Sequence, residues 1–326
     1  MSDAEDIGTW QAAWNTPRDV VDAVVRRAAG SGVVVDERIL EGHGNEVYGV
    51  RTADGQDLIV RICRRQGAGL DCERWPISAA LAAGVPAPPI LLIERLDLNG
   101  EELSIQVQQR LPGRTVHRLF GELSDAQLGR LTTGAGEILA MIHAIQPSGP
   151  GPIDPAGSCA ALPSTAGDAA VAAMIRRNGE LTTSGINTQL LQTAVEAVET
   201  GAALLDAAPV CLIHGDWRTT NVLSDGDSIT GVVDWEGARG GDAAFDFAGV
   251  WTVASRRKAT STELLLDAYR AAGARLDDAF HARRLLYSIA DLHSALGHFV
   301  STDRPDLLKQ AVDDLHANLR QLDDLT

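Results

Sequence analysis

The sequence has 326 residues, 45% hydrophobic and 22% charged, which are the proportions of an ordinary globular protein with one large domain or two lobes. Its formal net charge of −16 argues against a nucleic-acid or anionic-membrane partner, because both need a basic surface, but it is compatible with a cationic substrate. The first six residues include three acidic and no basic ones, and no apolar run approaches the roughly 20 residues that span a bilayer. We therefore expect a cytoplasmic protein.

The first third of the chain predicts one helix followed by a small antiparallel sheet. The helix is expected at about 16–29, with Thr16 as its N-cap and Pro17 at its first helical position. Short β-type runs broken by turns follow, and they predict strands at 33–35, 46–50, 58–62, 90–93 and 103–109. Asp54-Gly55 and Asn99-Gly100 are hairpin signals between consecutive strands. A helix at 71–83 separates the third strand from the fourth.

The rest of the chain is mainly helical in pattern. Helices are predicted at 124–143, at about 169–177, at about 186–207 and from 262 to the C-terminus. An irregular connection at 147–167 and a β-rich segment at 210–235 interrupt them. We therefore predict an α+β fold in which residues 1–110 form a β-rich amino lobe and residues 111–326 a helical carboxyl lobe, with a hinge near 109–113.

The β-rich segment carries the most informative chemistry. A short apolar strand leads to His214-Gly215-Asp216, Asn221 follows five residues after Asp216, and a second strand ends at Asp234. Pairing of these strands would place Asp216, Asn221 and Asp234 together at one end of the strand pair, which we call the mouth of the site. Phosphoryl transfer needs such a set, because one carboxylate orients the attacking hydroxyl while another carboxylate and an amide oxygen are hard ligands that suit Mg²⁺.

This segment resembles the aminoglycoside phosphotransferase family, whose fold is similar to that of protein kinases. The family pattern is H-G-D-x-x-x-x-N followed about a dozen residues later by an apolar strand ending in I/V-D-W/F, and thirteen residues separate Asn221 from Asp234 here. The resemblance runs from about residue 39 to residue 248. It implies a two-lobed, protein-kinase-like fold, with Asp216 as the catalytic base and with Asn221 and Asp234 as magnesium ligands.

Further residues of this region have expected roles by the same resemblance. His214 is expected to brace the loop rather than carry a proton, and Asp242 and Asp246 are expected to fix the following turn through hydrogen bonds. Arg218 stands where protein kinases with H-R-D-L-K-x-x-N have a lysine that reaches toward the transferred phosphate. The alternative for Arg218 is a surface arginine without a catalytic role.

The amino lobe supplies candidates for nucleotide binding. Gly42, Gly44 and Asn45 lie between two predicted strands, where backbone amides can approach phosphates. No Gly-Lys-Ser/Thr sequence follows, so the loop is not a P-loop.

Arg61 departs from the commonest kinase pattern, which has a lysine at this place. Macrolide phosphotransferases resemble this chain in having arginine here, and the planar fork of an arginine can bridge phosphates and a carboxylate. Glu73 on the next predicted helix is its expected partner, and Asp71 is the alternative, because helix phase alone does not separate the two.

The segment 104–113 resembles the family's hinge, an apolar strand running into x-L-x-G. Backbone groups from Gln109 to Leu111 would then hydrogen-bond the adenine edge of ATP. Hinge geometry, which sequence does not reveal, selects the base, so GTP stays open as the donor.

The acceptor is expected between the catalytic loop and the carboxyl-terminal helices. Several acidic and histidine residues there are candidate contacts, although most of them are expected to be solvated faces of amphipathic helices: Asp291, His293, His298, Asp303, Asp306, Asp313 and Asp314. The favoured acceptor is a hydroxyl of an aminoglycoside, macrolide or basic peptide antibiotic, which implies a role in antibiotic resistance. A metabolic sugar or amino-alcohol kinase is the alternative, and a nucleotide-binding module without turnover is a third reading.

Overall fold

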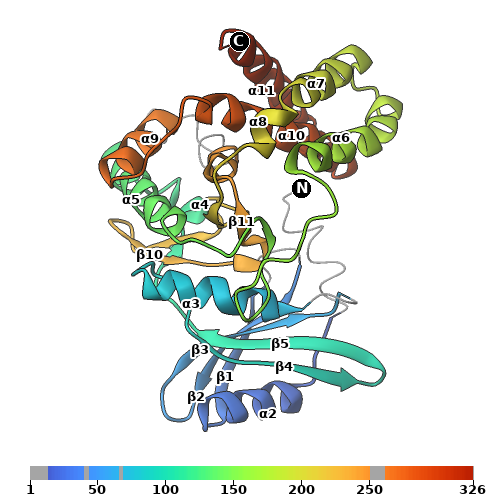
Figure 1. Ribbon diagram of the computed structural model, residues 1–326. Coiled ribbons are helices and arrows are strands. Elements are labelled where there is room, and N and C mark those ends of the chain that lie inside the picture. The colour runs from blue at the N-terminus through green and yellow to red at the C-terminus, as the bar shows by residue number, and fades with distance from the viewer. Residues whose placement is uncertain (1–13, 40–43, 66–68, 250–260, 326) are drawn as a thin grey trace.

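The computed structural model describes residues 14–39, 44–65, 69–249 and 261–325. Figure 1 shows a small β-sheet at one end of the molecule and a larger, mainly helical region at the other, joined through short strands between them. This arrangement confirms the predicted α+β class with a small antiparallel sheet and a helical part.

The sheet consists of five antiparallel strands. They are β1 (Val33–Ile39), β2 (Glu46–Thr52), β3 (Asp57–Cys63), β4 (Ile90–Leu98) and β5 (Glu101–Gln109), in the spatial order β1-β2-β3-β5-β4. The predicted Asn99-Gly100 turn has the expected backbone, because both residues adopt positive φ, at 57° and 86°, whereas at Asp54-Gly55 only Gly55 does, at 90°. Each predicted strand is present, and the structure extends most of them.

One helix, α2 (Arg18–Ala29), covers the outer face of the sheet. Its buried residues Val21, Val24 and Val25 join a hydrophobic cluster with inward-facing strand residues such as Val60 and Val107. The predicted N-terminal cap is wrong, because the N-cap residue is Pro17 and not Thr16. Thr16 instead donates its backbone N–H and its hydroxyl to the carboxylate of Glu46, at 2.9 and 2.8 Å. A buried carboxylate that needs donors therefore competes successfully with the helix for this side chain.

The helix predicted at 71–83 begins differently from the expectation. Its first turn is a 3₁₀ helix, η1 (Leu70–Glu73), and the α-helix α3 follows at Arg74–Ala82. Glu73 is therefore the last residue of the 3₁₀ turn, where the chain changes from one helix type to the other. Pro76 in the first turn of α3 is compatible with this position, because its missing N–H lies where a helix has no internal acceptor.

The helical region is built from eight α-helices among the described residues: α4 (Val116–Leu119), α5 (Asp125–His143), α6 (Ala166–Thr183), α7 (Thr188–Thr200), α8 (Ala202–Asp206), α9 (Thr262–Ala271), α10 (Phe280–Ser301) and α11 (Pro305–Asp323). Ser124 is the N-cap of α5 and forms a reciprocal capping box with Gln127. Two predicted bounds are wrong. Helix α6 is longer than 169–177, and the stretch 186–207 is divided at Gly201, against which Leu286 of α10 packs closely.

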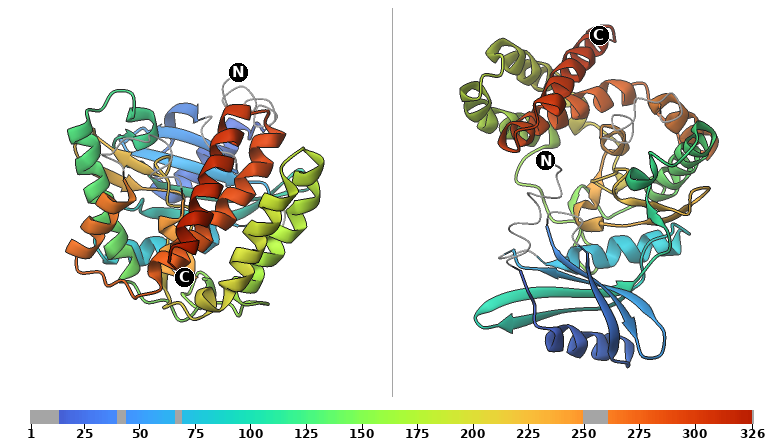
Figure 2. Two further views of the ribbon diagram at one scale, coloured as in Figure 1. Left: turned by 90° about the horizontal axis from the view of Figure 1, so that it is seen from above. Right: turned by 180° about the vertical axis from the view of Figure 1, so that it is seen from behind.

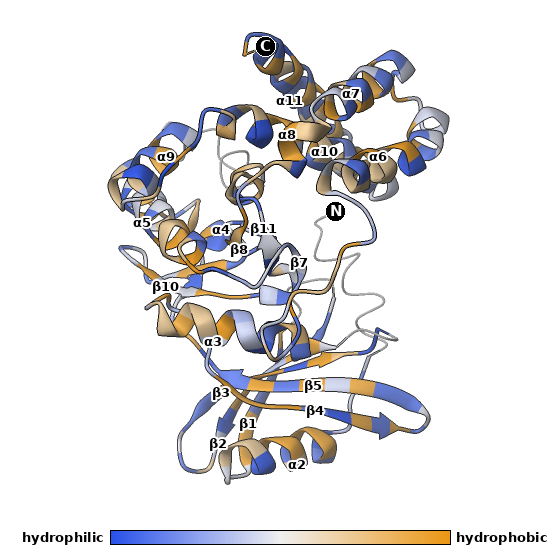
Figure 3. Ribbon diagram, in the orientation of Figure 1, coloured by the Kyte–Doolittle hydropathy of each residue, from blue (hydrophilic) through white to orange (hydrophobic). Residues whose placement is uncertain are grey.

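Two packed groups of helices form the helical region. Helices α6 and α7 pack on α10 and α11 around a core that includes Leu191, Leu286 and Leu315, and Figure 2 shows these four helices side by side. Helix α5 packs on α9 and on the short strands of the centre. Hydrophilic and hydrophobic residues alternate along α9 and α11 in Figure 3, as in amphipathic helices with one buried face. No helix of the described residues is long and apolar enough to cross a membrane.

Short strands between the sheet and the helices position the central loops. Strand β8 (Cys211–Ile213) pairs with β11 (Arg239–Gly241), which also pairs with β7 (Gly151–Pro152). Strands β9 (Val222–Ser224) and β10 (Ile229–Val232) form a hairpin, and β6 (Arg114–Thr115) pairs with β9. The 3₁₀ helices η2 (Trp235–Gly237) and η3 (Ala243–Phe247) follow β10 and β11. The end of β8, the start of β9 and the end of β10 therefore lie close together.

Candidate active site

The hairpin of β9 and β10 brings the predicted catalytic residues together. Asn221 immediately precedes β9, and its backbone carbonyl accepts the N–H of Val233, the residue before Asp234, at 2.9 Å. The side-chain amide of Asn221 donates to the backbone carbonyl of Asp216 at 2.9 Å and to its carboxylate Oδ2 at 2.8 Å. Asp216, Asn221 and Asp234, predicted from their spacing alone, therefore lie at the same mouth.

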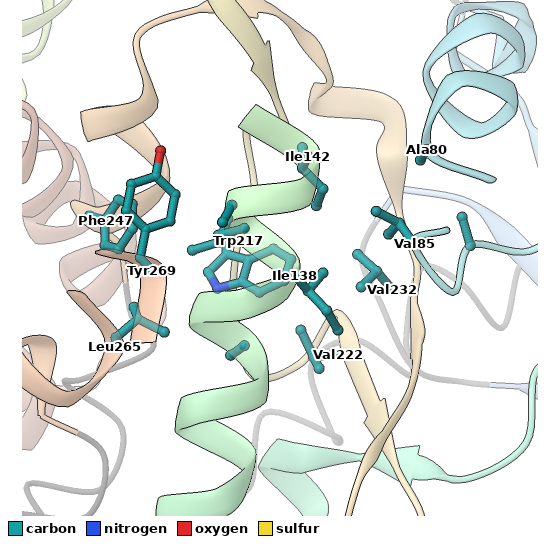
Figure 4. Close-up of a cluster of buried hydrophobic side chains, with 14 of the residues drawn as sticks. Ala80, Val85, Ile138, Ile142, Trp217, Val222, Val232, Phe247, Leu265 and Tyr269 are labelled. Carbon is teal, nitrogen blue, oxygen red and sulfur yellow. The ribbon is translucent and has the colours of Figure 1, made fainter. Parts of the chain in front are cut away.

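The backbone of the loop after β8 is fixed by residues on both sides of its exposed groups. The indole of Trp217 is 2% exposed and packs among Ile138 and Ile142 of α5, as Figure 4 shows. Thr219 is equally buried, and its carbonyl accepts the N–H of His117 at 3.0 Å. Gly215 has φ +78°, and a Cβ there would lie 2.1 Å from the carbonyl oxygen of Gly237. A side chain at this position would therefore displace the loop.

His214 is a buried part of this loop and does not reach its mouth. Its Nε2 contacts the carbonyl oxygen of Val233 at 3.1 Å, and its Nδ1 accepts the N–H of Asp216 at 3.3 Å. This pattern requires the neutral tautomer with the proton on Nε2. Burial lowers the pKa of His214, although neighbouring carboxylates including Asp246 oppose this effect. The contacts are those of a brace, which agrees with the role expected for His214.

Asp246 of η3 ties the start of the loop to the helical region. Its carboxylate accepts the backbone N–H groups of His214 and Gly215 at 2.7 and 2.8 Å. It also contacts Nε2 of His143 at 3.1 Å, and Nδ1 of that ring lies 3.0 Å from the hydroxyl of Tyr269. Burial alone raises the pKa of Asp246, but these hydrogen bonds and the adjacent histidines lower it below its ordinary value.

Asp242 performs a similar structural task one turn earlier. It is the N-cap of η3, where it accepts the N–H of Ala244, and it forms a buried ion pair with Arg283 of α10 at 2.7 Å. Arg283 also bonds the carboxylate of Asp277. The expectation that Asp242 and Asp246 fix this turn through hydrogen bonds matches these contacts.

Arg61 of β3 lies at the centre of the mouth and is 6% exposed. Its Nη1 contacts both carboxylate oxygens of Glu73 at 2.6 Å, and Gln106 of β5 bonds both members of this pair. The predicted Arg61–Glu73 pair is therefore present. Asp71 faces away toward Arg95, at 3.7 Å, which removes it as the alternative partner.

The second nitrogen of the same guanidinium reaches across to the catalytic segment. Nη2 of Arg61 donates to Oδ1 of Asp234 at 2.7 Å and lies 4.0 Å from the carboxylate of Glu236. Asp234 has a left-handed backbone, with φ 66°, which turns its side chain toward the sheet. Burial raises the pKa of Asp234, Arg61 opposes this shift, and the carboxylates of Glu236 and Asp216 add to it.

Glu236 and Gln106 are site residues that the sequence analysis missed. Glu236 bonds Arg65 at 2.7 Å and the side-chain amide of Asn45 at 3.3 Å, so it connects η2 to the segment before β2. In the sequence, Glu236 could have been found from its place two residues after Asp234. Gln106 could have been found from the alternation of side chains along β5, because Ile105 and Val107 are apolar and buried on the opposite face.

The predicted phosphate loop is described only in part. Gly42 lies outside the described residues, whereas Gly44 and Asn45 directly precede β2. Gly44 faces Arg65 and Glu236, and a Cβ there would make only ordinary contacts at 3.6 Å. Asn45 is 8% exposed and bonds Glu236. The segment therefore lies beside Asp234 and Arg61, at the same mouth.

The predicted hinge residues lie where β5 leaves the sheet. The backbone N–H groups of Gln109 and Arg110 are used by the sheet, because they donate to Pro89 and Asp57 at 2.9 and 3.0 Å. Among the described residues, no acceptor is found for the N–H of Leu111. Leu111 also packs against Gly231 of β10, where a Cβ would lie 2.6 Å from its side chain. Leu111 therefore offers a backbone donor beside the strand that leads to Asp234.

Arg218 lies on the outer side of Asp216. Its Nε donates to Oδ1 of Asp216 at 2.5 Å, and its Nη2 lies 3.6 Å from the carboxylate of Asp291 on α10. The Asp216 carboxylate is thus held at both oxygens, by Arg218 and by Asn221. Its side chain is 40% exposed, so Arg218 lies at the surface beside Asp216, and its role in transfer stays a prediction.

The oxygen atoms at the mouth fit a hard divalent cation. The amide nitrogen of Asn221 is used by Asp216, which leaves its carbonyl oxygen as a ligand atom, and Arg61 holds only Oδ1 of Asp234. The carboxylates of Glu73, Asp234 and Glu236 also come within 4.8 Å of one another. Arg61 binds both carboxylate oxygens of Glu73 but only Oδ1 of Asp234, so Oδ2 of Asp234 and the carbonyl oxygen of Asn221 are the atoms that suit Mg²⁺ here.

Comparisons with known proteins bear on this geometry. A family model described as the phosphotransferase enzyme family matches residues 36–286. No curated protein matched the sequence. Among solved structures, a thermostable mutant of aminoglycoside phosphotransferase APH(4)-Ia in ternary complex with ADP and hygromycin B is 20% identical, with a TM-score of 0.67 over 92% of this chain and 98% of that chain.

Two further structures have the same fold. A GDP and kanamycin complex of APH(2″)-IIIa is 13% identical, with a TM-score of 0.64 over 93% of this chain and 99% of that one. A predicted fructosamine-3-kinase from Thermobifida fusca is 20% identical, with a TM-score of 0.60 over 92% and 98%. At these identities the likeness shows the fold, and it confirms the kinase-like architecture expected from the sequence.

Proposed function

Because the chain belongs to the phosphotransferase enzyme family, we propose that it transfers the γ-phosphate of ATP to a hydroxyl group of a small molecule. The observation that carries this proposal is the convergence of Asp216, Asn221 and Asp234 at one mouth, with the Arg61–Glu73 pair facing them from the sheet. Phosphoryl transfer depends mainly on positioning and on charge stabilisation, and these residues supply both.

The nucleotide would lie between the sheet and the central loops. Its base would meet the backbone at Gln109 to Leu111, where the N–H of Leu111 is available. Its phosphates would extend toward the segment 42–45 and Arg61. ADP and GDP are bound to the structurally similar enzymes, which supports a purine nucleotide as donor. ATP is our choice, and GTP is the competing donor that the assay below includes. The lobe boundary at residue 110 is part of this proposal.

Chemistry at the mouth would be a direct in-line transfer. Asp216 orients the acceptor hydroxyl and accepts its proton as the oxygen–phosphorus bond forms, while the bond to the β-phosphate oxygen breaks and ADP leaves. Asn221 and Asp234 would hold Mg²⁺, which when bound neutralises charge on the phosphate oxygens. Arg61 adds a fixed positive charge beside the same oxygens. Arg218, next to Asp216, would reach toward the transferred phosphate.

The acceptor class is the finer part of the proposal. We favour an antibiotic of the aminoglycoside type, because hygromycin B and kanamycin are bound in the similar complexes and because the net charge of −16 suits a cationic molecule. A sugar-derived metabolite is the second candidate, since the fructosamine-3-kinase neighbour has the same fold.

Nucleotide release with a panel of acceptors tests this function. Mg-ATP and Mg-GTP would be supplied in parallel with aminoglycosides, hygromycin B, macrolides, basic peptide antibiotics, choline, homoserine and fructosamines. ADP or GDP release that depends on one acceptor and disappears in Asp216→Asn is the expected result. Measurable nucleotide binding without transfer to any acceptor or to water would instead favour the non-catalytic nucleotide-binding module.

A further inference from the structure

Arg218 lies between two carboxylates that come from distant parts of the chain. Its Nε donates to Asp216 of the catalytic loop at 2.5 Å, and its Nη2 is 3.6 Å from Asp291 of α10. The three side chains are each about 40% exposed, so they form the rim of the mouth and not part of the buried core. The guanidinium thus links the proposed base to a helix of the carboxyl-terminal part.

The backbone on either side of Arg218 is anchored by buried residues, whereas the Arg218 side chain is partly exposed and is held by carboxylates. Trp217 and Thr219 are both 2% exposed and hold the loop in place. A free arginine side chain has about 2 kcal/mol of rotamer entropy, so a second contact is needed to keep it in one orientation. The only acidic groups that the structure places against it are Asp216 and Asp291, within the described part of the chain.

Asp291 is itself held on a rigid element. Two residues later on the same helix, the fully buried ring of His293 contacts the side-chain oxygen of Asn178 on α6 at 2.7 Å through Nε2. Ile289 and Leu296 of α10 are also fully buried, in the core shared with α6, α7 and α11. The position of the Asp291 carboxylate is therefore set by helix packing and does not depend on the catalytic loop.

We propose that Asp291 is a positioning residue that holds Arg218 against Asp216 and thereby fixes the orientation of the base. This inference rests on the proposed function for its kinetic consequence. Asn221 holds one oxygen of the Asp216 carboxylate and Arg218 holds the other. When Asp291 is removed, Arg218 loses its second carboxylate, leaves its place more often, and the Asp216 carboxylate becomes free to rotate. Misorientation of a catalytic group lowers turnover with little effect on binding.

This role differs measurably from direct acceptor binding by Asp291. A residue that only contacts a cationic acceptor affects the acceptor KM, because the contact exists in the ground state and the transition state alike. A residue that acts through Arg218 affects kcat, and its effect disappears when Arg218 is already absent. The two roles therefore predict opposite results in a double-mutant cycle.

The experiment is such a cycle with Asp291→Asn, Arg218→Ala and the double variant, measured with the acceptor found in the panel. We expect Asp291→Asn to lower kcat about tenfold with the acceptor KM changed less than about twofold, and the double variant to match Arg218→Ala alone. Asp267→Asn on α9 is the matched control, because this carboxylate forms an exposed ion pair with Arg270, and its activity should equal that of the wild type. Additive losses, or a raised KM with unchanged kcat, would overturn the inference.

A second readout does not depend on turnover. In ¹⁵N NMR spectra, the Nε–Hε resonance of Arg218, assigned by its absence in Arg218→Ala, should shift and exchange faster with solvent in Asp291→Asn. Asp291→Glu, which keeps the charge, should restore part of the protection. An unchanged Arg218 signal in Asp291→Asn overturns the inference, even if the protein phosphorylates nothing. A changed signal in an inactive protein contradicts only the proposed function.

Discussion

Arg61 of β3 and Asp234 after β10 are 173 residues apart in the chain and form an ion pair at 2.7 Å. The same guanidinium also binds Glu73, so one side chain connects the sheet, the 3₁₀ turn before α3 and the catalytic segment. Arginine suits this position because the two terminal nitrogens of its planar guanidinium can each donate hydrogen bonds to a different carboxylate. Several expected outcomes depend on this connection.

Arg61→Lys should weaken Mg-ATP binding about tenfold, although lysine is the residue that most kinases have here. A single ammonium group does not span Glu73 and Asp234 as the fork does, so the lysine would follow one carboxylate and leave the other without its partner. Isothermal titration with Mg-ATP measures the effect. Arg95→Lys, in an exposed ion pair with Glu102, is the control with unchanged affinity. Equal affinities in the wild type and Arg61→Lys would show that the fork is not needed.

Asp234→Asn should raise the magnesium concentration required for half-maximal turnover by about tenfold or more, because an amide is a weaker ligand for Mg²⁺ than a carboxylate. It also leaves Nη2 of Arg61 without its carboxylate. A magnesium titration at fixed nucleotide measures the shift, and removal of metal by a chelator should abolish turnover in both proteins. Glu236→Gln provides the comparison, since Glu236 is not assigned to the metal and should shift the titration less. The reverse ranking would move the metal to Glu236.

Asp216→Asn should reduce turnover by about 10²- to 10⁴-fold and leave nucleotide affinity nearly unchanged. The amide keeps the shape of the side chain, and its oxygen still accepts from Asn221, but its NH2 meets the donor Nε of Arg218 and it no longer accepts a proton. Single-turnover transfer and nucleotide titration, measured side by side, separate the two quantities. A rate near that of the wild type would remove Asp216 from the role of base.

Asp246→Asn should destabilise the protein by about 3 kcal/mol, since it replaces a buried acceptor of two backbone N–H groups and a histidine with a group that donates on one side. Denaturant unfolding measures the loss. Asp225→Asn is the matched control, because Asp225 also accepts backbone N–H groups in a turn but is exposed, so a change of less than about 1 kcal/mol is expected. Equal losses would mean that burial of Asp246 adds nothing.

We expect the stability of the fold to depend on pH through Glu46, the first residue of β2. Burial raises its pKa, but hydrogen bonds from the N–H and hydroxyl of Thr16, from Tyr48 and from Arg64 lower the pKa to about 2, from an ordinary 4.5. A lowered carboxyl pKa stabilises the fold fully above pH 4.5, and the stabilisation is lost as the pH falls toward 2.

The difference in unfolding free energy between the wild type and Glu46→Gln should therefore be about 2 kcal/mol at pH 6 and should shrink steadily from pH 4.5 downward. Denaturant titrations at pH 6, 4 and 3 give the profile. The exposed Glu101→Gln, which alters an ion pair of the same Arg64, should show a much smaller and flatter difference. A difference independent of pH would contradict the lowered pKa.

The sequence predicted those parts of the site that depend on neighbours in the chain. The β9–β10 hairpin is local, so its strand pairing follows from short-range turn and strand signals, and it brings Asn221 and Asp234 together. The loop around Asp216 was recognisable for the same reason. The strands of the sheet and the helix at 124–143 were likewise predicted from local patterns, with errors of a few residues at the ends of the strands.

Several contacts between segments that are distant in the chain could not be predicted from sequence patterns. Glu73 and Asp71 are two residues apart, and only the 3₁₀ turn at Leu70–Glu73 decides which of them meets Arg61. Thr16 satisfied a sequence rule for helix capping, yet it bonds Glu46, because a buried carboxylate without donors costs more than a missing cap. Asp291 was one of seven candidates on the carboxyl-terminal helices, and the packing of α10 singles it out.

The sequence by itself determined which residue types stand in the segment 214–234 and at what spacing, because these are set by the covalent chain and by a local hairpin. The tertiary structure alone decided which charges are partnered. Ion pairs such as Arg61–Asp234 and Arg218–Asp291 join segments whose approach depends on how helices and sheet bury their apolar faces. Because burial depends on the whole fold, the orientation of each charged group at the mouth depends on the whole fold as well.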